Sequence, residues 1–381
     1  MTTLGILGGG ALARLLARAA QQIGVNAAIL DEDEFSPAAQ VTSFAITSSW
    51  SDKRTLDDFI NAVDAVTFER EIVPAEIIAR IEKSGRRVFP SAMTLTALQD
   101  RLTQKQTLTA AGLPTVAHTA VKTREDVHAF AAQHGYPVMV KTRMPGSSSD
   151  GPERLEIKGD GDAQAAWAAL EATGQPLMAE AFADYKRELS LIVVRGENGN
   201  IKHYPVTHTL HIEGHCHCVR ATIEGFDHPA VELGKQVVAA VEGVGAFGID
   251  LFEMKDGSML ISHVAPRVHT SGLYTIEGCL TSQFENHVRA VLGLPLGWTE
   301  MVKKSAVTIN CLGWKEAMPD ASDFEKALSF KGAHVHWYGE REFRKWRTLG
   351  HVTAVHDYEP EAERIARMSA GNLMGATEWF L

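Results

Sequence analysis

Short apolar runs alternate with helical patterns along the first 95 or so residues of the chain. Residues 4–7 and 26–30 are apolar runs typical of buried strands, and an Ala- and Leu-rich helical pattern over 11–22 lies between them. Residues 64–68 and 87–89 are further strand candidates. Strands that alternate with helices indicate a parallel, doubly wound sheet. The pattern therefore predicts a Rossmann-like domain over residues 1–95.

A second unit of helices and mainly antiparallel strands follows. A helical pattern over 94–112 ends at a glycine, and a polar loop of glycine, serine and proline spans 143–154. Further patterns predict helices at 126–134, 162–173, 228–243 and 283–291, and strands at 137–141, 176–180, 188–194, 201–206, 248–253 and 258–264. Several short strands follow residue 298. We expect domains over 1–95, 96–297 and 298–381, the last being small and mostly β.

Composition and charge restrict the classes of partner. Hydrophobic residues make up 45% and charged residues 22% of the 381 residues, which is ordinary for a globular protein. The net charge of −10 argues against nonspecific binding to nucleic acid or to anionic membranes. No apolar run reaches the roughly 18 residues of a membrane span, the N-terminus lacks the basic segment of a signal peptide, and the cysteines are too scattered for a disulfide framework. We expect a reduced, soluble, cytoplasmic protein.

A glycine turn near the N-terminus is the first candidate site. Gly8, Gly9 and Gly10 follow a predicted strand and open a predicted helix, and Asp31 ends the next strand. This arrangement matches the dinucleotide-binding fingerprint, in which backbone amides at a helix N-terminus meet phosphate and the acid meets a ribose. Three interpretations stay open: a nicotinamide site, a site for a smaller phosphorylated ligand, or a tight turn without a ligand. The first is disfavoured because no second mononucleotide-binding half follows residue 95.

A second candidate site lies between residues 248 and 272. Asp250 stands on one predicted strand, His263 on the next, and Arg267 in the loop that leads into a helix. An acid on a strand, a second strand and an Arg/His/Ser/Gly loop together are typical of a magnesium-nucleotide site closed by an anion-binding loop.

The order and spacing of several segments resemble the ATP-grasp ligases, and among them the 5-(carboxyamino)imidazole ribonucleotide synthetase family. These segments are the glycine turn and residues 67–74, 99–105, 136–143, 187–190, 204–211 and 265–296. The resemblance covers nearly the whole chain. It implies an ATP-grasp domain that is preceded by a Rossmann-like parallel-sheet domain and followed by a small, mostly β domain.

The resemblance also implies an activity. Members of this family carboxylate the amino group of 5-aminoimidazole ribonucleotide with ATP and bicarbonate, which gives 5-(carboxyamino)imidazole ribonucleotide, ADP and phosphate in purine biosynthesis. ATP and Mg²⁺ would be the cofactors, and a homodimer is implied. Two alternatives are an ATP-grasp ligase with a different amine acceptor and a non-catalytic paralogue that binds a nucleotide.

The resemblance assigns residues to the nucleotide and to the chemistry. Arg267 and Lys141 would be catalytic. ATP would contact the cations Arg101, Lys105 and Lys141, the loop donors Gly146, Ser147, Ser148 and Ser149, the hinge Glu180, Ala181, Phe182 and Ala183, and Glu188, His211, Ser262 and His263. For His211, a purely structural role is the alternative.

The predicted metal site departs from the family. Asp250 occupies the position of the first metal-binding acid, but Ser262 and His263 replace the Asn-Glu pair that carries the second. Magnesium prefers oxygen ligands, and imidazole is a poor substitute. We therefore expect a metal site of Asp250 and His263 that binds one magnesium ion more weakly than two carboxylates would. Glu253 is not recruited, because an offset of three residues on a strand points to the other face.

The acceptor end departs as well. The resemblance assigns substrate contacts to Gly9, Gly10, Glu69, His269, Ser271, Arg344 and Arg347. Glu340 and Thr348 stand where the family has lysines, and Thr270 and Leu273 replace an Asn and a His. A glutamate beside a dianionic phosphate adds repulsion, so we expect a weakened affinity for a ribotide phosphate.

A run of histidines and cysteines over 208–218 superficially indicates zinc. On a strand, His215 and His217 face away from Cys216 and Cys218, so the four side chains cannot converge on one ion. We therefore do not expect a zinc site there.

Overall fold

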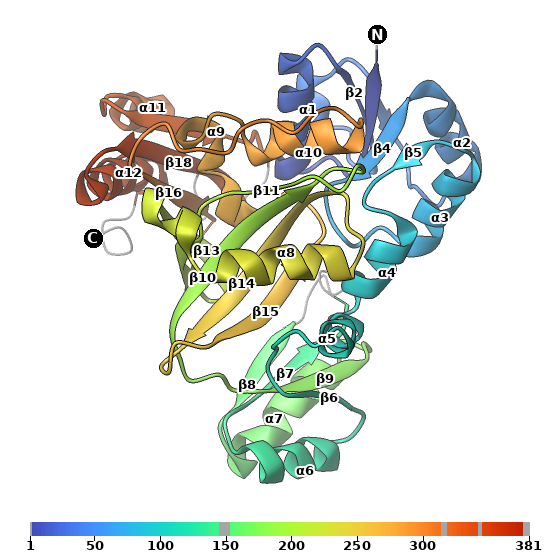
Figure 1. The fold of residues 1–381 in the computed structure, drawn as a ribbon, viewed down its shortest axis with the longest axis vertical. Coiled ribbons are helices and arrows are strands. Elements are labelled where there is room, and N and C mark those ends of the chain that lie inside the picture. Colours follow the sequence, from blue (N-terminus) through green and yellow to red (C-terminus); the bar gives the residue numbers. More distant parts are fainter. Residues whose placement is uncertain (1, 145–152, 314–317, 342–344, 376–381) are drawn as a thin grey trace.

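The N-terminal part is a five-stranded parallel sheet in the computed structural model, which describes residues 2–144, 153–313, 318–341 and 345–375. The strand order is β3-β2-β1-β4-β5 (Figure 1). Its elements are β1 (Thr3–Leu7), α1 (Ala11–Gln22), β2 (Asn26–Asp31), β3 (Ala45–Thr47), α2 (Lys53–Ala62), β4 (Ala65–Phe68), α3 (Ala75–Lys83) and β5 (Arg87–Val88). The predicted parallel sheet is confirmed, and α1 begins and ends where the apolar periodicity placed it.

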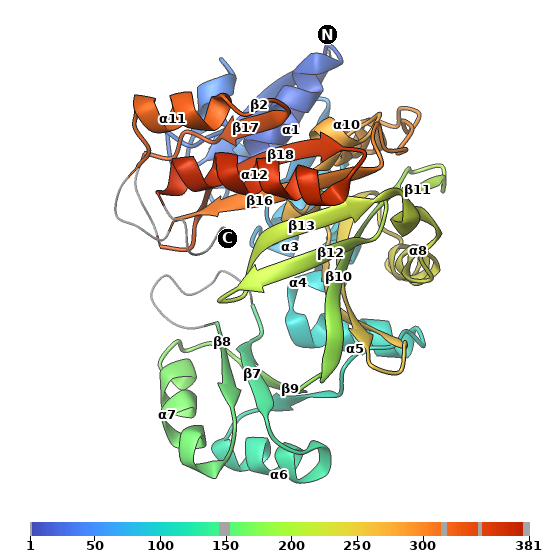
Figure 2. The same ribbon diagram turned by 90° about the vertical axis from the view of Figure 1, so that its left-hand side faces the viewer.

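Two helices lead from this sheet into a small four-stranded sheet. They are α4 (Ala92–Gln99) and α5 (Arg101–Ala110), and the sheet has the order β6-β9-β7-β8. Its elements are β6 (His118–Val121), α6 (Arg124–His134), β7 (Val138–Thr142), β8 (Arg154–Ile157), α7 (Asp160–Glu171) and β9 (Leu177–Ala181). Figures 1 and 2 both show this lobe, with α6 and α7 on its outer side, projecting from the rest of the molecule.

The largest sheet has nine strands and joins the middle of the chain to its C-terminal part. Its order is β15-β14-β10-β12-β13-β16-β18-β17, and β11 pairs with β10 (Figure 2). The strands are β10 (Tyr185–Arg195), β11 (Ile201–His203), β12 (Thr207–Ile212), β13 (His215–Thr222), β14 (Gly245–Met254), β15 (Met259–Ala265), β16 (Ser305–Leu312), β17 (Ala333–Trp337) and β18 (Thr348–His356). Because β13 pairs with β16, the segment after residue 298 extends this sheet.

Helices cover the large sheet on both sides. They are α8 (Ala230–Ala240), α9 (Thr275–Gly278), α10 (Gln283–Val291), α11 (Ala321–Leu328) and α12 (Glu359–Met374). Helix α10 packs against α1 and against the large sheet, in one core that both parts of the chain share. Its His287 accepts a hydrogen bond from the amide of Ala246 (3.0 Å), so its other nitrogen carries the proton that Thr67 accepts (2.7 Å). Burial lowers the pKa of His287 to about 4, which keeps this link neutral.

The predicted helix over 94–112 is wrong as a single element. Asp100 is extended, with φ −89° and ψ 122°, and separates α4 from α5. Its carboxylate accepts hydrogen bonds from the amides of Leu102 and Thr103, both at 2.9 Å, and so caps α5. An aspartate inside a helical pattern was the available signal for this break, since its side chain competes for backbone amides.

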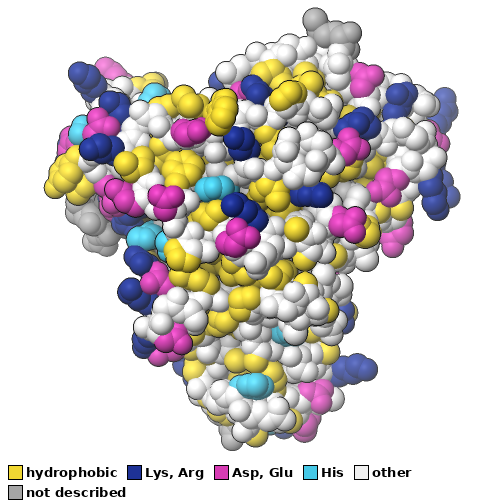
Figure 3. Space-filling view, viewed as in Figure 1, with side chains coloured by type: hydrophobic (Ala, Val, Ile, Leu, Met, Phe, Trp, Pro, Cys, Tyr) yellow, Lys and Arg dark blue, Asp and Glu magenta, His cyan; other side chains and the backbone are white. Residues whose placement is uncertain are grey.

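The surface in Figure 3 mixes acidic and basic side chains around apolar ones, without one extended region of a single sign on that face. Among the described residues, no helix is both long enough and apolar enough to cross a membrane.

Candidate functional site

Two lysines and one glutamate meet where α5, β7 and β9 approach one another. The ammonium group of Lys141, on β7, forms a short ion pair with the carboxylate of Glu180 on β9. Lys105, on α5, lies 3.7 Å from the other oxygen of Glu180 and donates to the carbonyls of Ile261 (2.9 Å) and Ser262 (2.8 Å) on β15. The lysine of α5 therefore links the small sheet to the strand of the predicted metal site.

Burial and charge act against each other in this group. Burial alone would raise the pKa of Glu180, but the charges of Lys141 and Lys105 outweigh it and hold the pKa at about 2. Burial lowers the pKa of Lys105 to about 8 despite its attraction to Glu180. One carboxylate is thus shared by two ammonium groups, which leaves positive charge for an anionic ligand. Lys141 is the more exposed of the two, at 18% against 2%.

Arg101 lies beside this group. Its guanidinium donates to the carbonyl of Thr142 (2.8 Å) and forms an ion pair with Glu153 (2.8 Å), the residue directly before β8. Its charge acts on both Glu180 and His263. Arg101 therefore adds positive charge near both the lysines and the predicted metal site.

The predicted hinge and loop residues are placed only in part. Ala181 ends β9, Phe182 is 47% exposed, and Ala183 precedes β10. Gly146, Ser147, Ser148 and Ser149 lie outside the described residues, and so does Arg344.

Glu188, the predicted ribose contact, faces two partners on β10 and β12. The hydroxyl of Tyr185 donates to one carboxylate oxygen (2.9 Å), and Nδ1 of His211 lies 2.5 Å from the other. Burial disfavours the charged carboxylate, but the hydrogen bond and charge of His211 and the hydrogen bond of Tyr185 together lower the pKa of Glu188. His211 therefore contacts the ribose-binding candidate directly, which suits either a nucleotide-contacting or a structural role.

Asp250 lies in a chain of polar groups behind the loop 267–272. Ser190 donates to its carboxylate (2.8 Å), the hydroxyls of Ser190 and Ser271 are 2.6 Å apart, and Ser271 reaches Nδ1 of His269 (2.8 Å). The second imidazole nitrogen of His269 lies 3.9 Å from Asp250. These contacts hold the predicted metal-binding carboxylate and two predicted substrate-binding residues as one unit.

His263 stands directly opposite Asp250 in the pairing of β14 with β15. Burial lowers the pKa of His263 to about 4, so its imidazole is neutral near pH 7. Glu253 lies on the other face of β14, where Arg187 and Lys186 bind its carboxylate. Successive side chains of β14 point to opposite faces of the sheet. Asp250 therefore lies on the same face as His263, and Glu253 lies on the other face.

Arg267 forms a buried ion pair with Glu71. The guanidinium makes two hydrogen bonds to that carboxylate, one of them 3.2 Å long. Burial would raise the pKa of Glu71, but the charge and hydrogen bonds of Arg267, with a smaller contribution from His263, together hold the pKa far below its usual range. The sequence pattern pointed to Glu69 and missed Glu71. No local signal separated the two acids, because their partners, the amides of Gly10 and Leu12 for Glu69 and Arg267 for Glu71, are distant in sequence.

The glycine turn is filled by the protein's own carboxylates. The amides of Gly10 (2.6 Å) and Leu12 (3.1 Å) donate to Glu69, and the amide of Gly9 donates to Asp31 (2.7 Å). A Cβ on Gly10 would lie 2.3 Å from the Glu69 carboxylate, so glycine is needed there for this contact. Burial raises the pKa of Glu69. A phosphate could reach these amides only by displacing Glu69 from Gly10 and Leu12 and Asp31 from Gly9.

Arg347, the predicted phosphate-binding residue that the structure describes, is paired with Glu340. Two of its nitrogens lie 2.8 Å from the same carboxylate oxygen. Glu340, which the sequence comparison predicted to replace a lysine, therefore already pairs with the arginine that was predicted to bind the substrate phosphate.

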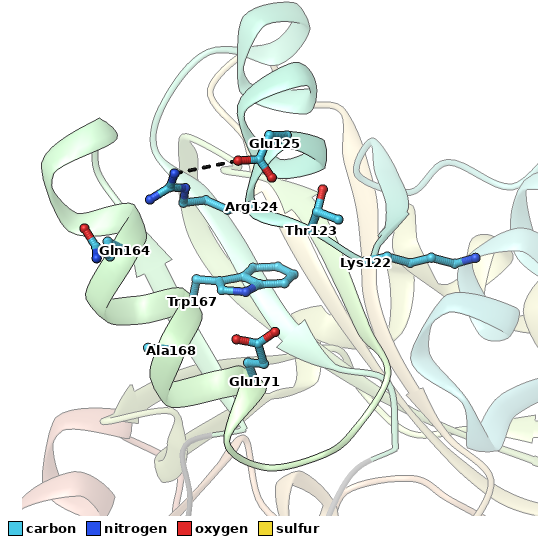
Figure 4. A pocket seen from close by; sticks show the side chains of 8 residues that line it. All are labelled: Lys122, Thr123, Arg124, Glu125, Gln164, Trp167, Ala168 and Glu171. Atoms are coloured by element: carbon cyan, nitrogen blue, oxygen red, sulfur yellow. Dashed lines mark ion pairs between the residues drawn. The ribbon is translucent and has the colours of Figure 1, made fainter.

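Two other features lie apart from this site. The recess in Figure 4 is formed by α6 and α7 around Trp167, with Arg124 and Glu125 in an ion pair at its rim, on the outer side of the small lobe. In the histidine and cysteine run, the His215 ring stacks on Trp346 at 5.7 Å, and Cys218 is buried.

Comparison with known proteins agrees with this architecture along the chain. Residues 1–99 match the ribonucleotide synthetase preATP-grasp domain, 106–284 the ATP-grasp domain, and 306–365 the phosphoribosylaminoimidazole carboxylase C-terminal domain. The N5-carboxyaminoimidazole ribonucleotide synthase of Pseudomonas aeruginosa is 36% identical over 92% of this chain and 93% of its own length. The chain belongs to the N5-carboxyaminoimidazole ribonucleotide synthase family of ATP-grasp proteins.

Solved structures support the same relationship. The synthetase from Thermus thermophilus superimposes with a TM-score of 0.87 at 33% identity and covers 99% of each chain. The synthase from Aspergillus clavatus, in complex with ADP and 5-aminoimidazole ribonucleotide, gives a TM-score of 0.89 at 30% identity over 98% of this chain and 99% of that one. The predicted fold class and family are confirmed.

Proposed function

We propose that this protein carboxylates 5-aminoimidazole ribonucleotide with ATP and bicarbonate to give N5-carboxyaminoimidazole ribonucleotide, ADP and phosphate. The observation that carries the proposal is the full-length similarity to synthases of this activity. The group of Lys141, Lys105 and Glu180 adds support, because its net positive charge suits a polyphosphate. Excess cationic charge at a buried site is costly unless an anion is bound there.

The reaction has two steps. A bicarbonate oxygen attacks the γ-phosphorus of ATP, the bond to the β-phosphate oxygen breaks, and carboxyphosphate and ADP form. The amino nitrogen of the acceptor then attacks the carboxyl carbon, or carbon dioxide released from it. Phosphate leaves, and the nitrogen loses a proton. Lys141 and Arg101 would stabilise the transferring phosphoryl group by charge, and Arg267 would hold the bicarbonate-derived anion.

Asp250 and His263 fit one magnesium ion and not two. A single carboxylate with phosphate oxygens meets the preference of magnesium for oxygen, whereas a neutral imidazole adds little. When bound, the ion would neutralise phosphate oxygens during transfer. Asp250 would be its principal protein ligand, held in place by Ser190.

A second candidate is the same ligase chemistry on a different amine acceptor. The specific observation is the pairing of Arg347 with Glu340, which removes a cation from the predicted phosphate position. A homodimer, which the family resemblance implies, remains part of the proposal.

The test is ADP release with bicarbonate, with and without 5-aminoimidazole ribonucleotide. Stimulation by the ribotide, together with formation of the carboxylated product, supports the main proposal. Bicarbonate-dependent ADP release that the ribotide does not change favours the different acceptor. An absence of turnover in protein that still binds ADP would show a non-catalytic paralogue and overturn both.

A further inference from the structure

A histidine pair and a glutamate meet on the large sheet, at a place that the proposed reaction does not use. His336 lies on β17 and stands directly opposite His351 of β18 in the antiparallel pairing. Glu277 lies on the short helix α9, which packs against β18. The sheet register and this helix together bring three side chains from distant parts of the chain to one point.

The contacts within this group are close. Nε2 of His336 lies 2.6 Å from Oε1 of Glu277, and the rings of His336 and His351 stack with centroids 4.4 Å apart. One possible ligand atom from each residue lies within 4.8 Å of the other two. Among the residues that the structure describes, this is the one group of three or more His, Cys, Asp or Glu side chains with such proximity.

Two atoms of this group are buried without a hydrogen-bond partner. They are Oε2 of Glu277 and Nε2 of His351, and His351 is fully buried. Next to them, on β16, Asn310 faces His351 in register, and its Oδ1 also lacks a partner. An unsatisfied buried polar atom destabilises the folded state, and native proteins rarely tolerate one. Several such atoms at one point indicate a missing partner.

A hydrogen bond to the other side of His351 indicates what that partner is. The hydroxyl of Tyr338 lies 2.6 Å from Nδ1 of His351. When Nδ1 donates to this oxygen, Nε2 is left with a lone pair that no group in the described part of the protein uses. Metal-binding histidines are commonly held in this way, with the second nitrogen donating to an oxygen. A cation would satisfy the carboxylate, the imidazole and the amide oxygen together.

We propose that Glu277, His336 and His351 bind a divalent metal ion of the zinc class. Two imidazoles and a carboxylate are ligands that zinc accepts and magnesium does not favour. The rings of the two histidines are parallel within 4°. Binding therefore requires the less buried His336 to turn and to exchange its contact with Glu277 for the ion. The amide oxygen of Asn310, which stands opposite His351 in the sheet and lacks a hydrogen-bond partner among the described residues, is a candidate for a fourth ligand.

Such an ion would stabilise the acceptor end of the molecule. Helix α9 follows the loop of Arg267 and Ser271, and β18 begins directly after Arg347. Linking α9 to β17 and β18 fixes these two segments relative to each other. The ion would therefore be structural and would take no part in phosphoryl transfer.

The test is zinc binding by untagged full-length protein. The protein is stripped with a chelator and titrated with Zn²⁺ in excess Mg²⁺ and ADP, so that oxygen-rich positions are occupied. We expect one zinc per chain by elemental analysis and a higher Tm with zinc. Cobalt in place of zinc should give the visible absorption of a four-coordinate ion. Glu277→Gln and His336→Gln should each abolish the Tm increase, and Tyr338→Phe should weaken zinc affinity by about 10–100-fold.

His334→Gln is the matched control, because His334 is an exposed histidine on the same strand. It should bind zinc like the unmodified protein. Glu277 and His336 were chosen because they are partly exposed, at 12% and 15%, and their variants are expected to fold, which circular dichroism checks. If the unmodified protein binds no zinc under these conditions, or if folded Glu277→Gln and His336→Gln bind it equally well, the proposal is wrong.

Discussion

The two ends of the candidate site differ in how cations are partnered. At the nucleotide end, Lys105 and Lys141 share the single carboxylate of Glu180. At the acceptor end, Arg267 has Glu71 to itself and Arg347 has Glu340. The first arrangement leaves positive charge for an anion, whereas each of the two described arginines in the second is paired with its own acid. The two ends therefore differ in how readily an incoming anion can find an unneutralised cation.

The largest effect is expected at the buried pair of Arg267 and Glu71. Arg267→Met should lower the free energy of unfolding by about 3–5 kcal/mol, because Glu71 is left charged and buried. Urea unfolding measures the change. Glu71→Gln added to Arg267→Met should restore part of it. Arg80→Met, which breaks the exposed pair with Asp57, is the control and should cost no more than about 1 kcal/mol. Equal losses in the two arginine variants would contradict a special role for burial.

Removing a cation at the nucleotide end should weaken ATP binding. Lys141→Ala should cost about 2–3 kcal/mol of binding free energy, as for a charge-assisted contact. Calorimetry with ATP measures it. Lys122→Ala, which removes an exposed lysine from the same lobe, should leave the affinity unchanged. Unchanged affinity in folded Lys141→Ala protein would place the phosphates elsewhere.

The pH dependence of ATP binding should report Lys105. Burial lowers its pKa to about 8, so its charge is present below that pH and is lost as the pH rises through it. ATP affinity should therefore fall by roughly threefold to tenfold between pH 8 and pH 10. The Lys105→Met variant should bind ATP more weakly at pH 7 and lose this pH dependence. If the Lys105→Met variant kept the full pH dependence of ATP binding, another ionisable group would be responsible for it.

Adding an oxygen ligand tests whether His263 lies at the predicted metal site. His263→Glu should bring the site closer to two carboxylates, so half-saturation with magnesium should need severalfold less metal and turnover should rise. Steady-state ADP release over a magnesium titration measures both. His263→Gln, which adds no carboxylate, is the control. If His263→Glu changes neither value while Asp250→Asn abolishes turnover, His263 is not at the metal position.

The smallest effect is expected at the partly exposed pair of Arg347 and Glu340. Glu340→Gln frees the guanidinium, so the KM for 5-aminoimidazole ribonucleotide should fall by about threefold, consistent with less than 1 kcal/mol for such a pair. Glu340→Lys combined with Thr348→Lys should lower the KM further. Salt should raise the KM, because the attraction is screened. Glu361→Gln, which breaks an exposed pair with Arg364, should leave the KM unchanged.

Much of the fold could be predicted because the local periodicity of apolar residues determines where many helices and strands form. Helices α1 and α10 begin and end at the residues where their apolar patterns do. The alternation of β14 likewise separated Asp250 from Glu253, which lies with Arg187 on the other face. Strands β12 and β13 were not predicted, since their histidines, cysteines and threonines give no clear apolar alternation.

The partners of the charged residues were decided only by the tertiary structure. Glu71 and Arg267 are 196 residues apart in sequence, and Lys105 reaches carbonyls of β15 that lie 156 and 157 residues away. Sequence indicates which residue types could bind phosphate or metal, because that chemistry belongs to the side chain. Which acid neutralises which cation depends on sheet register and on the packing of distant segments. Glu277, His336 and His351 show this most clearly, since no local spacing connects them and only the alignment of β17, β18 and α9 brings them together.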